Sequence, residues 1–177
     1  MNLSRHVTFE NFIFLIISLV LVLLFSGGVE AVTNWSVDKR FKDNGDKTIT
    51  DTKTGLMWMK EDSYLHSGHW VNWFESIQFI KKINEDGFAN QYDWQIPSVD
   101  QLTTLYEADK INSKVLGRGM NIHIDSIFSK EGGASLWSIE ENGYHNAFGV
   151  IFNTGKRFNS SKKSRFRKSF RAVRYSN

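Results

Sequence analysis

The sequence predicts an α+β domain, with two helices followed by several antiparallel strands. Each predicted helix opens with a capping pattern and continues with apolar residues at helical spacing. The last third of the chain consists of short β-rich runs separated by turn residues. Two helices followed by several hairpins are typical of the α+β class.

Three short strands are expected before the helices. Arg40 enters the first, and the Asn-Gly pair within 43–46 tolerates the positive φ of a tight turn. Residues 48–50 alternate and are β-rich, which indicates a second strand. A further turn ends at Gly55, and residues 56–59 are apolar on both faces, which predicts a central strand.

The first helix is predicted from Trp73 to Asp86. Asn72 and Glu75 form a capping-box pattern at its start, and Gly87 suits the left-handed position after its end. The apolar stripe predicted for its buried face consists of Trp73, Phe74, Ile77, Ile80 and Ile83.

The second helix is predicted to begin after Pro97, where Ser98 and Gln101 repeat the capping pattern. Its expected buried residues are Val99, Leu102, Leu105 and Tyr106. Residues 107–127 are expected to form an irregular surface loop. The strands expected after that loop span 136–139, 147–152 and 170–175, with a turn at 153–156.

The composition excludes several kinds of site. The 177-residue chain has no cysteine, which excludes disulfides, thiolate metal sites and cysteine nucleophiles. Six tryptophans and 14 phenylalanines can instead supply a core held by packing alone.

The first 31 residues resemble a secretory signal peptide. Residues 12–25 are uncharged and almost wholly apolar, Arg5 precedes them, and small residues follow at 29 and 31. The alternative is an uncleaved anchor, which would attach the protein to a membrane. Either alternative places residues 32–177, expected to be one domain, outside the cytoplasm, whether secreted, periplasmic or at the cell surface.

Charge is divided unevenly along the chain. Residues 32–155 contain 12 Lys and Arg against 17 Asp and Glu, a net charge of −5. Residues 156–177, called here the basic C-terminal segment, contain nine Lys and Arg and no acid. Such asymmetry predicts association with polyanions rather than a particular fold.

Four stretches in this order resemble the Lcl C-terminal domain family, named for a bacterial collagen-like adhesin. They are RFKDNGDKTITDTKTGLMW at 40–58, DWQIPSVDQL at 93–102, SLWS at 135–138 and FRAVR at 170–174. The resemblance implies a C-type-lectin-like fold, with two helices packed on small antiparallel sheets and adjacent N- and C-terminal strands. It also implies a structural role for the motif residues Gly55, Trp58, Trp94, Pro97, Trp137, Arg171 and Arg174.

The chain departs from the family pattern at three positions. Gln95 stands where the family usually has Arg, and Gln101 where it usually has Glu. A hydrogen bond between the two amides is expected to replace a charged pair, without the cost of desolvating charges. Lys47 replaces a turn glycine and is expected to adopt a conformation that a side chain tolerates.

No catalytic residue, metal site or cofactor is predicted. The turn at 43–51 lacks oxygen ligands at alternating positions, so a plain hairpin turn is favoured over a calcium loop. His66 and His69 lack a third ligand at a suitable spacing, and no Ser-His-Asp arrangement is evident. Trp35 and Trp70 are candidates for sugar stacking, with packing at the rim of the core as the alternative.

The basic C-terminal segment is the strongest candidate for function. Arg171 and Arg174 lie three apart on an expected strand and so face opposite sides, which assigns one of them as a structural partner for Asp51 or Asp93. The other cations can bind sulfate, carboxylate or phosphate. The predicted exposed contacts are Lys162, Lys163, Arg165, Arg167 and Lys168.

The sequence therefore predicts a non-enzymatic adhesion or binding domain that takes an extracellular polyanion without calcium. Anionic polysaccharides such as glycosaminoglycans suit the expected compartment better than nucleic acid, for which no specific recognition is expected. The resembled adhesin's domain binds glycosaminoglycans, which supports this expectation by analogy. The alternatives are a self-associating structural module, in which the basic segment meets the acidic body of another copy, and an enzyme with an unrecognised site.

Overall fold

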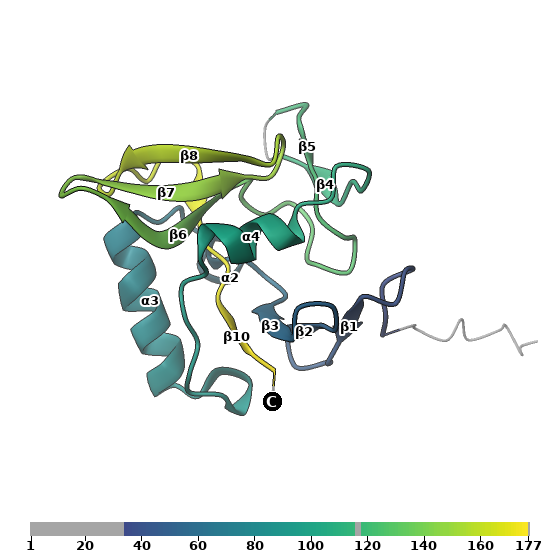
Figure 1. Ribbon diagram of the computed structural model, residues 1–177. Coiled ribbons are helices and arrows are strands. Elements are labelled where there is room, and N and C mark those ends of the chain that lie inside the picture. Colours follow the sequence, from purple (N-terminus) through teal and green to yellow (C-terminus); the bar gives the residue numbers. More distant parts are fainter. Residues whose placement is uncertain (1–33, 116–117, 177) are drawn as a thin grey trace, which may run out of the picture. The chain divides into compact units, whose positions relative to one another are not determined.

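The computed structural model describes residues 34–115 and 118–176. These residues form helices and β-sheets joined by turns and loops (Figure 1). The predicted α+β class is confirmed. The signal-peptide prediction for residues 1–31 lies outside the described residues. Among the residues described, no helix has both the length and the apolar character needed to cross a membrane.

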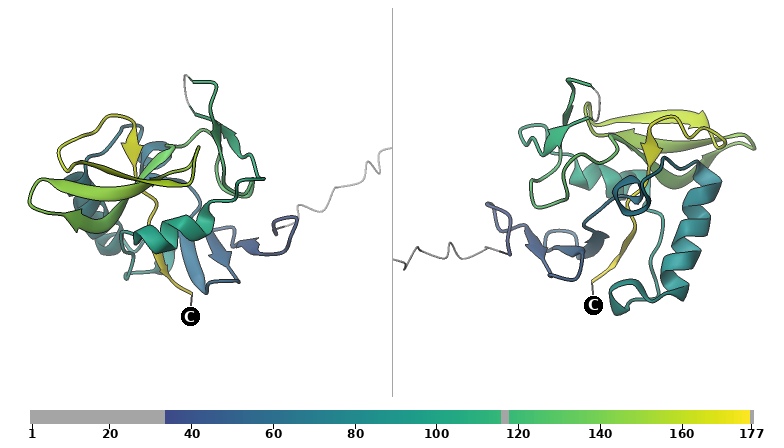
Figure 2. Two further views of the ribbon diagram at one scale, coloured as in Figure 1. Left: turned by 45° about the horizontal axis from the view of Figure 1, so that its top comes forward. Right: turned by 180° about the vertical axis from the view of Figure 1, so that it is seen from behind.

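The first sheet joins both ends of the domain. Its strands are β1 (Phe41–Asp43), β2 (Thr48–Asp51), β3 (Leu56–Met59) and β10 (Val173–Tyr175), antiparallel in the order β1-β2-β3-β10. The central place predicted for residues 56–59 is confirmed. The C-terminal strand descends beside the N-terminal strands in each view (Figure 2).

The second large sheet has the order β8-β7-β6-β9, with β6 (Ser135–Asn142), β7 (Asn146–Ile151), β8 (Lys156–Ser161) and β9 (Lys168–Ser169). β9 pairs with β6 in parallel, whereas the other pairs are antiparallel. The strand predicted over 170–175 is shorter than expected, because residues 170–172 cross between the two sheets and regular pairing resumes at Val173. A two-stranded hairpin, β4 (Ser113–Lys114) and β5 (Asn121–Ile122), interrupts the expected 107–127 loop.

Both predicted helices and their capping boxes are present, as α3 (Trp73–Glu85) and α4 (Val99–Leu105). A shorter helix, α2 (Ser63–Ser67), was not predicted, because its five residues carry no apolar periodicity. A 3-10 turn, η1 (Phe88–Asn90), follows α3. α4 packs against β6 and β7 (Figure 1).

The stripe predicted for α3 is partly wrong. Phe74 is 46% exposed and Ile77 is 37% exposed, whereas Ser76 is fully buried. The buried face runs through Trp73, Ser76 and Ile83, since the helix contacts the sheet over a narrower arc than its apolar residues cover. The exposed apolar side chains line surface hollows described below.

The three motif tryptophans lie in the core, as predicted. Trp58 belongs to one buried cluster with Phe41 and Leu102, and Trp94 and Trp137 belong to a second cluster. None of the three is more than 1% exposed. Packing of large aromatic side chains therefore provides the cohesion that disulfides supply in many secreted domains.

Two turn residues, Gly55 and Lys47, adopt a positive φ, which is unfavourable for Lys47. Gly55 has a φ of 69°, which glycine adopts without steric penalty. Lys47 also takes a positive φ, 71°, in the left-handed region that side chains enter less readily. The backbone of Lys47, which was expected to adopt a tolerated conformation, is therefore strained.

Both arginines of the closing motif are buried, so neither joins an exposed patch. Arg174 donates to Asp93 at 2.6 Å, which confirms one of the two expected acid partners. Arg171 lies before β10, donates to the carbonyl oxygen of Met59 at 2.7 Å and lies over the Phe128 ring. Burial lowers the pKa of the Arg171 guanidinium to about 10.

Acid is expected to destabilise the domain through paired carboxyls such as Asp93. The hydrogen bond from Arg174 lowers the pKa of Asp93, and that from Lys110 lowers the pKa of Asp38. Because these pKa values are lower in the folded state, the stabilisation is present above the unfolded value of about 4 and is lost as pH falls further. The free energy of unfolding, measured in urea from pH 7 to pH 2, should stay nearly constant down to about pH 4 and decrease below that pH.

The matched test is Asp93→Asn against Asp100→Asn, which changes a solvent-facing carboxyl of α4. We expect Asp93→Asn to cost about 1 kcal/mol at pH 7, because the exposed carboxylate is partly screened by solvent. We also expect it to reduce the loss of stability below pH 4. Equal acid profiles for the two variants would contradict this assignment.

Candidate functional site

The basic C-terminal segment begins on the exposed edge of the second sheet. β8 is the edge strand, and the register places Lys156, Ile151, Ser135 and Lys168 in one row across the four strands. Residues in register lie on the same face of a sheet. Lys156 and Lys168, far apart in sequence, therefore lie at opposite ends of one row.

Lys162 does not have the exposure predicted for it. It is 5% exposed, its ammonium donates to Glu141 and to the carbonyl oxygen of Tyr144, and it lies over the Trp73 ring. The Lys162 N–H also donates to the carbonyl oxygen of His145 at 2.8 Å, so both the main chain and the side chain of Lys162 contact the β6–β7 hairpin. Lys162 therefore holds the hairpin in place rather than facing a ligand.

Lys163 and Arg165 are exposed as predicted, but Arg165 is already paired. Its guanidinium contacts both carboxylate oxygens of Glu75, with Nε donating to Oε2 at 2.8 Å. The same Glu75 carboxylate accepts the Asn72 N–H in the capping box of α3. The hydrogen bond from Arg165 lowers the pKa of Glu75. Arg165 thus attaches the loop after β8 to the start of α3.

Lys168, which was predicted to be exposed, is instead a half-buried cation without an acidic partner among the described residues. Its ammonium lies 5.5 Å from the centre of the Trp137 ring and 5.2 Å from that of Phe158. Burial lowers the pKa of Lys168, since removal from water disfavours the charged form. Cation–π contacts offset part of that cost, but within the part of the chain that the structure describes no carboxylate pairs with this ammonium.

Lys168 borders a hollow of about 230 Å³ that combines cations with aromatic side chains. We call it the cationic hollow. Trp70 and Phe166 supply the rings, and Phe166 is 70% exposed. No acidic residue is among the described side chains that line the hollow, and its cations are Arg118, Arg167 and Lys168.

The two tryptophans proposed for stacking differ in their surroundings. Trp70 stacks on Tyr64 with ring centres 3.8 Å apart and also reaches the cationic hollow, so rim packing and access to a ligand coexist there. Trp35 pairs with the strand residue Lys42 through a β-bridge and lies outside the hollows described here.

A second hollow of about 420 Å³ adjoins the start of the same loop. Exposed rings of Phe74 and Tyr144 flank it, and Lys163 and Glu141 bring charges of both signs. We call it the mixed hollow. The loop from Ser161 to Lys168 thus connects a hollow of mixed charge to one whose charged side chains, among the described residues, are all cations.

Sequence reasoning identified the cations of this loop but not the residues that complete the hollows. Arg118 and Tyr144 come from distant hairpins, and nothing in the local sequence associates them with residues 161–168. Gly149 likewise leaves room for the Phe158 ring, and its place between Phe158 and Trp137 follows only from strand register.

The acidic residues of the turn at 43–46 form hydrogen bonds and ion pairs within the protein. Asp43 pairs with Lys60, and Asp46 accepts hydrogen bonds from the hydroxyl and the N–H of Thr48. These contacts belong to a hairpin turn. Within residues 34–115 and 118–176, no group of three or more His, Asp or Glu side chains is arranged to hold a metal ion.

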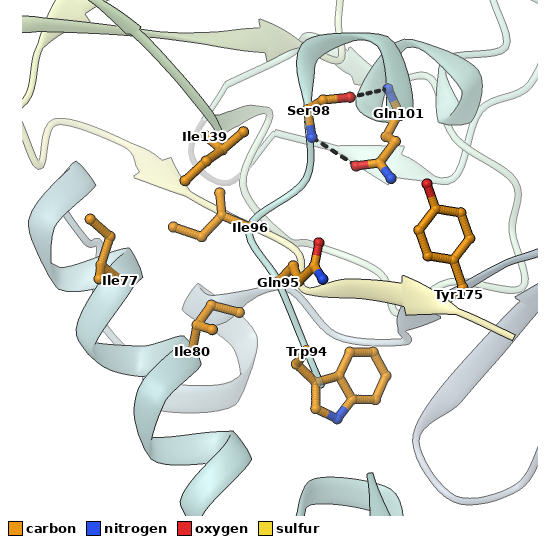
Figure 3. Close-up of a pocket in the computed structure, with 9 residues that line it drawn as sticks. All are labelled: Ile77, Ile80, Trp94, Gln95, Ile96, Ser98, Gln101, Ile139 and Tyr175. Atoms are coloured by element: carbon orange, nitrogen blue, oxygen red, sulfur yellow. Dashed lines mark hydrogen bonds between the residues drawn. The ribbon is translucent and has the colours of Figure 1, made fainter. Parts of the chain in front are cut away.

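Two of the three departures from the family pattern, Gln95 and Gln101, line a separate groove and form no hydrogen bond with each other. Gln101 accepts the N–H of Ser98 at 2.8 Å as part of the capping box of α4. Gln95 forms a backbone bridge with Val173, and its side chain is exposed. The predicted bond between the two amides is therefore wrong, because each side chain is directed by its own local structure. Both line the groove in Figure 3.

Comparison with known families identifies a family for most of the described chain. Residues 47–174 match the family model of the Lcl C-terminal domain, and this range covers the helices and the cations of the loop. The match begins at Lys47, so Arg40 and Phe41 of the motif quoted above precede it. No curated protein matches the chain.

Proposed function

We propose that this chain, which belongs to the Lcl C-terminal domain family, is a non-enzymatic binding domain for an anionic glycan outside the cytoplasm. The C-type-lectin-like arrangement is part of this proposal, and the pairing of β3 with β10 near the chain ends supports it. The binding surface consists of the cationic hollow and the exposed cations Lys156 and Lys163.

The observation that carries the proposal is the position of Lys168. A half-buried ammonium without a carboxylate lowers the stability of the folded protein, so folding alone does not account for it. Residues that reduce stability are common at functional sites. A sulfate or carboxylate bound in the cationic hollow would supply the missing negative charge.

The two hollows suit different parts of one polymer. The cationic hollow has the charge to take an acidic group, and its volume of about 230 Å³ fits a small group rather than a large ligand. The mixed hollow offers exposed rings on which a sugar can stack. A glycan lying along residues 161–168 would reach both, and its binding would depend on charge.

The test is retention of the full domain on immobilised heparin over a salt gradient. The binding variant replaces Lys156, Lys163 and Lys168 with Ser, and the matched control replaces Lys47, Lys53 and Lys81 with Ser. Both variants remove three positive charges, but the control cations are exposed outside the basic C-terminal segment. We expect the binding variant alone to lose retention near physiological salt, unchanged by chelator.

The salt dependence separates local contacts from net charge. Each ionic contact adds roughly one to the slope of log affinity against log salt, so the binding variant should lose most of that slope. Equal losses in the two variants would show that net charge alone drives retention, which would contradict the proposal. If the unmodified protein is not retained and its mass rises with concentration, a self-associating module is favoured instead.

A further inference from the structure

We propose that a second, uncharged site binds an extended peptide segment that carries a branched aliphatic side chain. The site is the groove in Figure 3, called here the isoleucine groove. It shares no lining residue with the cationic or mixed hollow and does not depend on the proposed glycan binding.

The groove has one apolar side and one polar side. Ile77 and Ile80 project from α3, and Ile96 and Ile139 face them from the segment before α4 and from β6 (Figure 3). Gln95, Gln101 and Tyr175 are the polar residues at the other side. The volume of about 600 Å³ lies within the usual range of ligand sites.

The polar side keeps hydrogen-bonding groups that the described residues do not use. The Gln101 carbonyl oxygen accepts the Ser98 N–H, but its amide nitrogen donates to no described residue. The Gln95 amide and the Tyr175 hydroxyl have no hydrogen-bond partner among the described residues, and Tyr175 is 62% exposed. These groups include both donors and acceptors and face one groove.

This combination favours a peptide over other occupants. No charged side chain is among the residues that line the groove, so recognition of an ion is not expected. A peptide group offers one donor and one acceptor, which the glutamine amides can match, whereas a hydrocarbon chain would gain nothing from them. The four isoleucines offer contact to a branched aliphatic side chain.

The exposure of the walls also suits a chain that crosses the groove. Ile139 is 47% exposed and Ile77 is 37% exposed, so the groove is open rather than enclosed. An open groove can accept a segment of a longer chain, whereas an acyl chain gains most from full enclosure. An uncharged segment of another extracytoplasmic protein is therefore the expected occupant.

The experiment is an NMR titration of the full domain with acetyl-Val-Ile-Val-amide. The reporters are the methyl groups of Ile77, Ile80 and Ile139 and the side-chain amides of Gln95 and Gln101. We expect saturable shifts confined to these groups, with a dissociation constant of about 1 mM for so short a peptide. Acetyl-Val-Asp-Val-amide should cause at least fivefold smaller shifts at equal concentration.

Two variants and a control connect the shifts to the groove. Gln101→Glu keeps the acceptor of the capping box and adds a charge, and Ile77→Lys changes a side chain outside the core. Each should weaken peptide binding at least fivefold. Ile111→Lys changes a more exposed isoleucine, 58% exposed and outside the groove, and should leave binding unchanged.

Three results would overturn the proposal. The first is an absence of saturable shifts up to about 10 mM peptide. The second is a larger effect of octanamide than of the peptide on the same methyl groups, which would identify a hydrocarbon site. The third is concentration-dependent shifts without peptide that Ile77→Lys abolishes, which would show that a second copy covers the groove. Each readout is independent of heparin retention, so either proposal can fail alone.

Discussion

Replacing Asp62 with alanine is expected to lower the free energy of unfolding by about 3–5 kcal/mol. The carboxylate is fully buried and accepts hydrogen bonds from the Leu65 N–H at 2.9 Å, the Gly133 N–H at 2.5 Å and the Ser169 hydroxyl at 3.1 Å. It thereby connects three segments that are distant in the sequence: the start of α2, residues 132–134 and β9.

The loss has two physical sources. The Gly133 N–H and the Ser169 hydroxyl would be buried without an acceptor, at about 1–3 kcal/mol each before relaxation. The buried Arg171, whose pKa Asp62 raises through its charge, would also lose a nearby negative group.

Urea unfolding followed by tryptophan fluorescence would measure this effect. Asp62→Asn keeps an oxygen for the cap of α2 but not the charge, and it should fall between the alanine variant and the unmodified protein. Asp100→Ala, on the exposed side of α4, should change stability by only a few tenths of a kcal/mol. A loss below about 1 kcal/mol for Asp62→Ala would show that the surroundings relax around the missing carboxylate.

Replacing Gly149 with alanine is expected to cost about 3 kcal/mol and to weaken heparin binding as well. A Cβ at this position would lie 2.5 and 2.6 Å from two atoms of the Phe158 ring, and nearer still to the backbone oxygen of Leu136. The ring can rotate away, but the oxygen belongs to the neighbouring strand β6. Relief would therefore require β6 and β7 to separate.

The same substitution reaches the proposed binding surface. Gly149 pairs with both Trp137 and Phe158, whose rings meet at a centroid distance of 5.2 Å, and Lys168 lies over both rings. Displacing Phe158 would move the support of the Lys168 ammonium. A folded Gly149→Ala protein should therefore leave heparin at lower salt than the unmodified protein.

Gly119→Ala is the matched control, because its Cβ would have no neighbour within 4 Å and the residue does not have a positive φ. Its unfolding free energy should stay within about 0.5 kcal/mol of the unmodified value. Thermal and urea unfolding of the two variants, measured side by side, test the prediction. Similar stabilities for both would show that β7 accommodates a methyl group at Gly149.

The structure separates two roles within a run of cations that is uniform in sequence. Lys162 and Arg165 pair with acids and hold the loop after β8, whereas Lys163 is exposed and Lys168 has no acidic partner among the described residues. A variant that neutralises the whole run would remove both roles at once. The three-cation variant above therefore leaves Lys162 and Arg165 in place.

Features that depend only on neighbouring residues could be predicted from the sequence. The capping boxes at Asn72 and Ser98 were predictable because each needs only residues three apart. The turn at Gly55 and the central strand after it were predictable for the same reason. The absence of cysteine and the charge of the basic C-terminal segment were also plain from composition.

The availability of these side chains to a ligand depends instead on contacts that form when the chain folds. Lys162 is buried because Glu141, 21 residues away, meets it across the sheet, and no local pattern specifies that pairing. The cationic hollow and the isoleucine groove likewise join segments whose proximity comes from strand register and helix packing. Local signals act over a few residues, whereas burial and charge pairing depend on contacts between segments far apart in the chain.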